Sequence, residues 1–136
     1  MTAATVFNGR TVEGVQFTIL HRFCAITASG AVSPVTKEGK LIQRADVTSV
    51  SVSVFNSAGR QIGSSATPSV ASTFFDTLQT TETWENIPLG GNFRYTVPAT
   101  YFPCGNDIQK IQIYVLLADG NILPALWSIY VIPTIN

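Results

Sequence analysis

Strict alternation of apolar and polar residues restricts the fold of this sequence more than any other feature. Positions 48–55 read Thr-Ser-Val-Ser-Val-Ser-Val-Phe, so the three valines lie on one face of an extended chain and the three serines on the other. Weaker alternation recurs at 15–23, 91–97 and 111–117. A period of two predicts half-buried β-strands, and the near absence of a 3.6-residue period argues against helices.

Turn-forming residues separate these segments. Asn-Ser-Ala-Gly-Arg at 56–60 and Ala-Asp-Gly-Asn at 118–121 predict tight turns, and the second is the strongest hairpin signal in the chain. Two prolines bracket a corner at 98–103, and Pro124 places the early part of the last strand at a sheet edge or a bulge. Positions 70–78 fit either a short strand or one helical turn, and both alternatives stay open.

About seven short strands, with turn signals every eight to twelve residues and no helix between them, predict an all-β fold. We expect a single antiparallel β-sandwich domain over residues 1–136, with residues 1–14 as a candidate N-terminal arm. An immunoglobulin-like topology is preferred and a jelly roll is the alternative, because strand order cannot be read from one sequence. The residues expected to fill the core are Val50, Val52, Val54, Phe93, Tyr95, Ile111, Ile113, Val115 and either Leu126 or Trp127.

Charged residues are scarce. They make up 12% of the chain, against about 25% in a typical soluble domain, and their net charge is zero. A surface covered by Ser, Thr, Asn and Gln in place of charge favours association with partners. Nucleic acid is not an expected partner, because the basic residues are scattered. No apolar run approaches 18 residues and positions 1–10 lack a secretion signal, so we expect no membrane partner and no export.

The two cysteines and the single histidine have no recognisable functional spacing. Cys24 and Cys104 are too far apart in sequence for a metal or redox motif, and we expect reduced thiols, with one long-range disulfide as the open alternative. His21 lies on the apolar face of the strand at 15–23, where a core histidine is more common than a catalyst. A lone histidine excludes multi-histidine zinc centres, so we expect no metal and no cofactor.

No catalytic set is recognisable, and we expect no catalytic residues. A Ser-His-Asp triad would need His21 as its base, yet the chain has no Gly-x-Ser-x-Gly elbow. Asp76, Glu82 and Glu85 could in principle supply paired carboxylates, but a solvated loop is the simpler interpretation. The alternative function is a carbohydrate-binding module in which Trp84 stacks on a sugar beside Glu82 and Glu85; against it, such a tryptophan often plugs the rim of a sandwich core.

Four features follow one another between about residues 42 and 132: a Val/Ser strand ending at Asn56, then Trp84, then an Asn-Phe-Arg strand ending at Pro98, and finally the Asp119-Gly120 hairpin. In this order they resemble small immunoglobulin-like domains of tailed-bacteriophage virion and prophage-type proteins. The resemblance implies a non-enzymatic virion structural protein, such as a capsid decoration or cement protein or a head-tail accessory, assembled in the host cytoplasm. It implies capsid or neck subunits as partners, with the chain in a homo-oligomer or bound to a lattice, and carries over no catalytic residue.

The first part of the chain fits that resemblance less well and is the expected contact with neighbouring subunits. Positions 2–7 are apolar and uncharged, precede the first convincing strand and have no obvious partner within the predicted sandwich. An unpaired strand edge invites addition to a neighbouring sheet, so we expect residues 1–14 and a hairpin at 30–42 to bind other subunits. The residues expected to make these contacts are Ala4, Val6, Phe7, Lys37, Glu38 and Lys40.

Overall fold

The computed structural model describes residues 6–25, 40–85, 87 and 90–134. β-Strands dominate these residues, which confirms the predicted all-β fold, and the helices are single turns. The strands are β1 (Val6–Val12), β2 (Phe17–His21), β3 (Cys24–Ala25), β4 (Lys40–Leu41), β5 (Val47–Phe55), β6 (Phe74–Gln79), β7 (Gly91–Val97), β8 (Asp107–Leu117) and β9 (Ile122–Ile132). The helical turns are η1 (Arg44–Asp46), α1 (Val70–Thr73), η2 (Glu82–Trp84) and η3 (Ala99–Tyr101).

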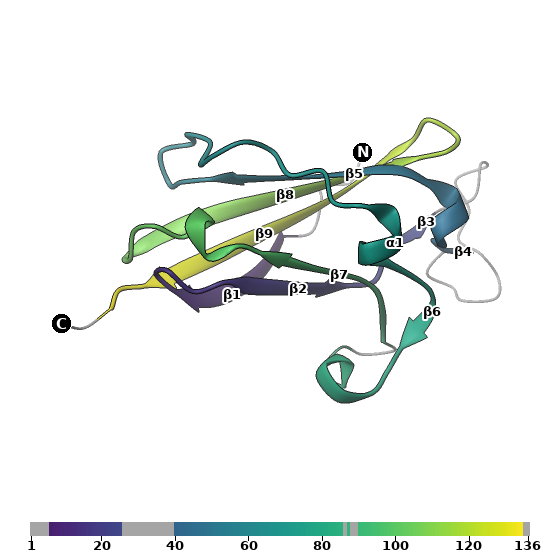
Figure 1. Ribbon diagram of the computed structural model, residues 1–136, viewed down its shortest axis with the longest axis horizontal. Helices are drawn as coiled ribbons and strands as arrows, with labels where there is room; N and C mark the ends of the chain where they lie inside the picture. The colour runs from purple at the N-terminus through teal and green to yellow at the C-terminus, as the bar shows by residue number, and fades with distance from the viewer. Residues whose placement is uncertain (1–5, 26–39, 86, 88–89, 135–136) are drawn as a thin grey trace.

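Two sheets form a sandwich (Figure 1). The larger has the strand order β1-β9-β8-β5 and the smaller β2-β7-β6, while β3 and β4 form a separate ribbon. In an immunoglobulin sandwich, strands B, E and D share one sheet and strands C, F and G share the other. Here β2, β7 and β6 correspond to the first set and β5, β8 and β9 to the second, so the topology is immunoglobulin-like and not a jelly roll. The sandwich is not wholly antiparallel, because β1 runs parallel to β9.

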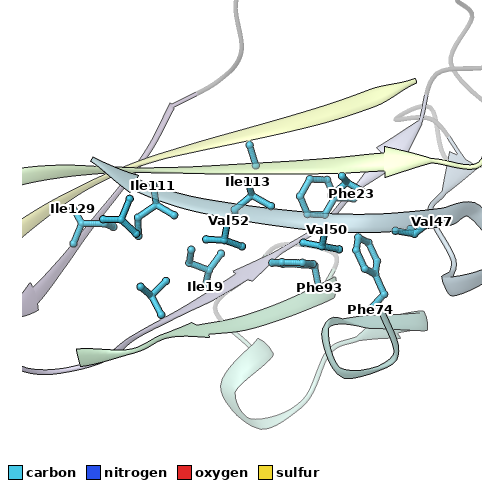
Figure 2. Packing of buried hydrophobic residues seen from close by; sticks show 14 of the residues in the cluster. Ile19, Phe23, Val47, Val50, Val52, Phe74, Phe93, Ile111, Ile113 and Ile129 are labelled. Atoms are coloured by element: carbon cyan, nitrogen blue, oxygen red, sulfur yellow. The ribbon is translucent and has the colours of Figure 1, made fainter. Parts of the chain in front are cut away.

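The inner faces of the two sheets meet in one apolar core. Figure 2 shows Val50 of β5 and Phe93 of β7 pointing into the space between the sheets. The predicted core is confirmed: the alternating valines, isoleucines and Phe93 are buried, and Tyr95 and Trp127 are half-buried against them. Of the two alternatives in the last strand, Trp127 faces the core and Leu126 the opposite side of the sheet.

Residues 6–12 belong to the sandwich, contrary to the expectation that this region lacks a partner there. β1 pairs with β9 along its whole length, and the ring of Phe7 packs against Trp127 and His21, with centroid distances of 5.1 and 4.8 Å. The strand shows no apolar alternation because Gly9 occupies an inward position, where a Cβ would come within 2.7 Å of the Phe17 ring. Residues 1–5 of the predicted arm lie outside the described residues.

Positions 70–78, which fit both a strand and a helical turn, contain one of each. Ser69 caps α1, its hydroxyl accepting a hydrogen bond from the Ser72 N–H at 3.2 Å. The turn of helix ends at Thr73, and the fully buried Phe74 begins β6. The two patterns were inseparable in sequence because each element is too short to show its own period.

The two strongest turn predictions are confirmed. The Asn56 side-chain oxygen accepts a hydrogen bond from the Arg60 N–H at 2.9 Å and closes the turn after β5. Asp119 accepts one from the Asn121 N–H at 2.9 Å between β8 and β9. Gly120 in that turn has φ of 90°, in the left-handed region that favours glycine. Both turns are therefore determined by local chemistry.

A buried amide ties the β3–β4 ribbon to the sandwich. Asn92 of β7 is fully buried, and its Oδ1 accepts a hydrogen bond from the Phe23 N–H at 2.8 Å. Its Nδ2 donates to the carbonyl oxygens of Phe23, at 3.1 Å, and Ile42, at 2.7 Å. One side chain thus satisfies backbone groups on both segments that lead to the ribbon, which a buried polar residue must do to avoid a desolvation cost.

Asn92→Ala is expected to lower the free energy of unfolding by about 2–4 kcal/mol, because it leaves the buried Phe23 N–H and the Ile42 carbonyl without their partner, while the Phe23 carbonyl keeps the Ile42 N–H. Asn92→Asp should be equally harmful, since a carboxylate accepts hydrogen bonds but cannot donate them. Urea unfolding measures both. The control is Asn8→Ala at an exposed position of β1, with an expected effect within about 0.5 kcal/mol. Similar effects at the two positions would contradict the anchoring role of Asn92.

Candidate interaction surface

The four-stranded sheet turns one face to the core and the other outward. Residues paired across neighbouring strands share a face, so Tyr130 lies beside Arg10 of β1 and Ile108 of β8, and Tyr114 lies beside Ser51 of β5. We call this side the outer face. The residues of this face whose side chains the structure describes are Asn8, Arg10, Val12, Ser49, Ser51, Ser53, Phe55, Ile108, Lys110, Gln112, Tyr114, Leu116, Ile122, Pro124, Leu126, Ser128, Tyr130 and Ile132.

Apolar side chains are concentrated on the outer face. Among the described residues seven large apolar side chains are exposed, and five of them lie here, Ile122 the most exposed at 58%. The other two, Val15 and Leu78, lie in the β1–β2 turn and on β6. The five are Ile108, Tyr114, Ile122, Tyr130 and Ile132. Apolar surface gathered in one place marks an interaction site, whereas scattered apolar residues need no explanation.

The outer face carries little charge. Arg10 and Lys110 are the charged side chains that the described strands place on it, and serines cover the part formed by β5. A partner could therefore cover most of this face without desolvating a charged group, the most expensive component of burial. The arrangement suits non-covalent binding of another protein surface.

The exposed tyrosines already have local hydrogen-bond partners. The Tyr130 hydroxyl donates to Asn106 Oδ1 at 3.1 Å, and the Tyr114 hydroxyl donates to Gln112 Oε1 at 3.2 Å. Tyrosine is enriched in interfaces because it combines a large apolar ring with a polar tip. Here both tips are satisfied within the chain, so covering either ring leaves no unpaired hydroxyl.

Of the N-terminal contact residues expected from the sequence, Phe7 is not part of this surface. Phe7 was expected to touch other subunits, but its ring is half-buried against Trp127 inside the sandwich, because β1 completes the sheet. Val6 and Lys40 are the first residues of β1 and β4. Of the others, Ala4, Lys37 and Glu38 lie outside the described residues, as does most of the predicted hairpin at 30–42.

The candidate sugar platform at η2 is not exposed. Trp84 is 6% exposed and packs edge-on against Phe75, with a centroid distance of 5.6 Å. Its ring also lies so close to Gly91 that a Cβ there would come within 2.6 Å of it. Stacking on a sugar needs an open ring face, so Trp84 plugs the rim of the sandwich instead. Glu82 and Glu85 are exposed beside it.

The other polar candidates are separate from one another. Asp76, grouped with the two glutamates in sequence, accepts a hydrogen bond from the Arg44 N–H at 2.8 Å. Cys24 and Cys104 are reduced thiols, the first half-buried and the second exposed. Within the described ranges, no three His, Cys, Asp or Glu side chains gather in a way that could hold a metal ion. The helical segments of the same ranges include none with the length and apolar character needed to span a membrane.

His21 is an uncharged core residue at neutral pH. Its ring packs edge-on against Phe7 and Phe23, with centroid distances of 4.8 and 4.4 Å, and lies 6.4 Å from the Trp127 ring. Burial in this aromatic cluster, and secondarily the positive charge of Arg22, lowers the pKa of His21 from 6.5 to about 4. Its expected place on the core side of the strand is confirmed.

Stability is expected to fall as the pH drops from 6.5 to about 4. In this window the unfolded chain binds a proton at His21 and the folded chain does not, so acid favours unfolding by about 3 kcal/mol in total. Above pH 6.5 neither state is protonated at His21, and below about 4 both are, so the change in stability takes place within that window and the full loss remains below it. Urea unfolding at several pH values should show a smaller loss for His21→Phe, which keeps an aromatic ring. Equal losses in both proteins would contradict the lowered pKa.

The outer face is the feature that sequence reasoning missed. Positions 122–132 are apolar on both sides of the strand, unlike the Val/Ser alternation of 48–55. In a sheet covered on one side only, such a strand leaves apolar groups exposed, and this was the available signal. Comparison with known proteins adds no relative, since no family model, curated protein or solved structure matches the chain.

Proposed function

We propose that this chain is a non-enzymatic structural subunit of a bacteriophage virion, and that another protein subunit covers its outer face. The observation that carries the proposal is the gathering of five exposed large apolar side chains on one nearly uncharged sheet face. An apolar surface of this kind is suited to a permanent contact, because burial of apolar area drives association and little charge must be desolvated. The low overall charge of the chain supports the same conclusion.

The virion setting rests on the resemblance of the segments between residues 42 and 132 to phage immunoglobulin-like domains. In this chain those segments are architectural: they form β5, the tryptophan plug at η2, β7 and the β8–β9 hairpin. A sandwich that presents one apolar sheet face is suited to decorating a capsid or joining head to tail. No observation favours the carbohydrate-binding alternative, since its tryptophan is buried.

Incorporation into phage particles tests the proposal. Tyr114→Lys places a charge on the outer face, whereas Leu78→Lys makes the same kind of change at a similarly exposed residue of β6, 39% against 42%. When only one variant is supplied during assembly, particles should hold about a tenth or less of the normal amount of Tyr114→Lys, because an unpaired charge must be buried. The Leu78→Lys protein should be incorporated normally.

Quantitative mass spectrometry of purified particles measures both variants against the parent chain. Absence of the parent chain from particles would refute the virion role. Equal incorporation of both variants would refute the outer face as the contact.

A further inference from the structure

The outer face carries two basic residues near one end, which we call its basic end, and an acidic residue lies in the turn beyond the other end, which we call its acidic end. Arg10 and Lys110 lie in the half where β1 and β9 end and β8 begins. At the opposite end Asp119 is exposed in the β8–β9 turn, where its carboxylate holds the Asn121 N–H at 2.9 Å. Two carboxylates also lie near the basic end. Asp107 starts β8 but is paired with an inward-facing residue of β9, so it belongs to the other side of the sheet. The carboxylate of Glu13, directly after β1, accepts hydrogen bonds from the Gly105 N–H at 2.6 Å and the Thr134 N–H at 3.1 Å, beyond the ends of the strands.

The apolar side chains also form two groups. Ile108, Tyr130 and Ile132 lie at the basic end, and Ile122 and Leu116 lie at the acidic end. Between them lie Gln112 and Tyr114 in the middle of β8, beside Leu126 and Pro124 of β9, so apolar side chains continue across the middle of the face. A surface that carries one apolar group and one sign of charge at each end is complementary to itself when it is reversed along the strands.

We propose that the outer face binds a second copy of this chain, with the two sheets packed face to face about a twofold axis that crosses the strands. The second copy would occupy the same surface that the proposed function assigns to a partner, so this proposal rests on that function. In this arrangement β8 of one copy runs antiparallel to β8 of the other, near the axis at Gln112 and Tyr114. The basic end of each copy then lies over the 118–121 turn of its partner, and each apolar group meets the other. Sheets stack in this way about 10 Å apart.

Charge selects this partner and this orientation. A twofold axis parallel to the strands would bring Arg10 and Lys110 of both copies together, and like charges oppose one another across an interface. An unrelated partner would need its own acidic group at the right distance, whereas a second copy supplies Asp119 twice, since an isologous interface repeats every contact. Zero net charge lets two copies approach without long-range repulsion.

Sedimentation equilibrium of the full-length protein is the first measurement. We expect a dimer with a dissociation constant of about micromolar order. Tyr114→Lys, which places two lysines near the axis, should weaken it about 100-fold or more. Leu78→Lys, outside the interface, should leave the constant within about twofold. Ile122→Lys at the exposed start of β9 is the second interface variant, used if circular dichroism shows that Tyr114→Lys does not fold.

A charge exchange then tests the orientation. Arg10→Asp and Asp119→Lys each leave two like-charge contacts in their own homodimer, and each should weaken dimerisation about tenfold. Mixed in equal amounts, the two variants form a heterodimer in which both contacts again join opposite charges, so the mixture should regain the affinity of the parent. Asp119→Asn keeps a side-chain acceptor for the Asn121 N–H in the turn, so it should weaken dimerisation less than Asp119→Lys does.

A parent chain that stays monomeric at about 1 mM, or a mixture that binds no more tightly than the single variants, overturns the second-copy proposal. Either result is distinct from failure of the proposed function. If the parent chain is a monomer and the Tyr114→Lys variant is excluded from particles, the outer face binds a different virion protein. If the parent chain is a dimer and the Tyr114→Lys variant is incorporated normally, the self-association proposal stands, but the outer face is not the contact with the particle.

Discussion

Val52→Asp is expected to leave the chain unfolded at room temperature. Val52 lies in the middle of β5 opposite Ile113 of β8 and is 2% exposed. An aspartate there either buries a charge or is neutralised by a raised pKa, and each outcome costs several kcal/mol beyond the lost packing of the valine. The sum of about 5 kcal/mol or more is comparable with the whole stability of many domains.

Ser49→Asp is the matched control, because it places the same carboxylate at an exposed position on the same strand. Its expected effect is within about 0.5 kcal/mol. Thermal unfolding followed by circular dichroism measures both variants. A Val52→Asp protein that melts within about a degree of the parent would show that β5 does not present Val52 to the core.

Deleting residues 2–10 is expected to unfold the monomer or cost it about 4 kcal/mol or more. The deletion removes most of β1 and leaves β9 without the neighbour that it pairs with over residues 126–132. It also removes Phe7, so the rings of Trp127 and His21 lose a packing partner and become exposed to water. Loss of strand pairing and loss of apolar burial therefore act together.

Two variants separate these contributions. Deletion of residues 2–5 leaves every residue of β1 in place and should leave the melting temperature near that of the parent. Phe7→Ala keeps the strand and removes the ring, so it should cost about 2–3 kcal/mol. If the chain lacking residues 2–10 is as stable as the parent, β1 is an arm and the N-terminal region becomes a candidate contact once more.

The strands were predictable where one face is buried and the other solvated. The Val/Ser alternation of 48–55 follows directly from the position of β5, with valines in the core and serines on the outer face. Pro124 is consistent with its predicted place at an edge or bulge: among the described residues, the pairing of β9 with β1 begins at Leu126, two residues after the proline. β1 was missed because Gly9 and polar neighbours interrupt its alternation.

The outer face could not be derived residue by residue, because it depends on register between separate strands. Ile108 and Tyr130 are neighbours only because the β8–β9 turn sets the offset between the two strands. Arg10 joins them through a parallel pairing between the first strand and the last. A parallel pairing between distant strands is not connected by a tight turn, so it leaves no short-range signature in the sequence.

The sequence by itself determined the class of fold, the main turns and most of the core, because each depends on the period of a segment or on the chemistry of a few adjacent residues. Only the tertiary structure decided the parallel β1–β9 pairing, the burial of Trp84 and the low pKa of His21. These are properties of neighbours brought from elsewhere in the chain. Trp84 illustrates the difference: whether its ring faces a sugar or the core was decided by Phe75 and Gly91, and they leave no open face.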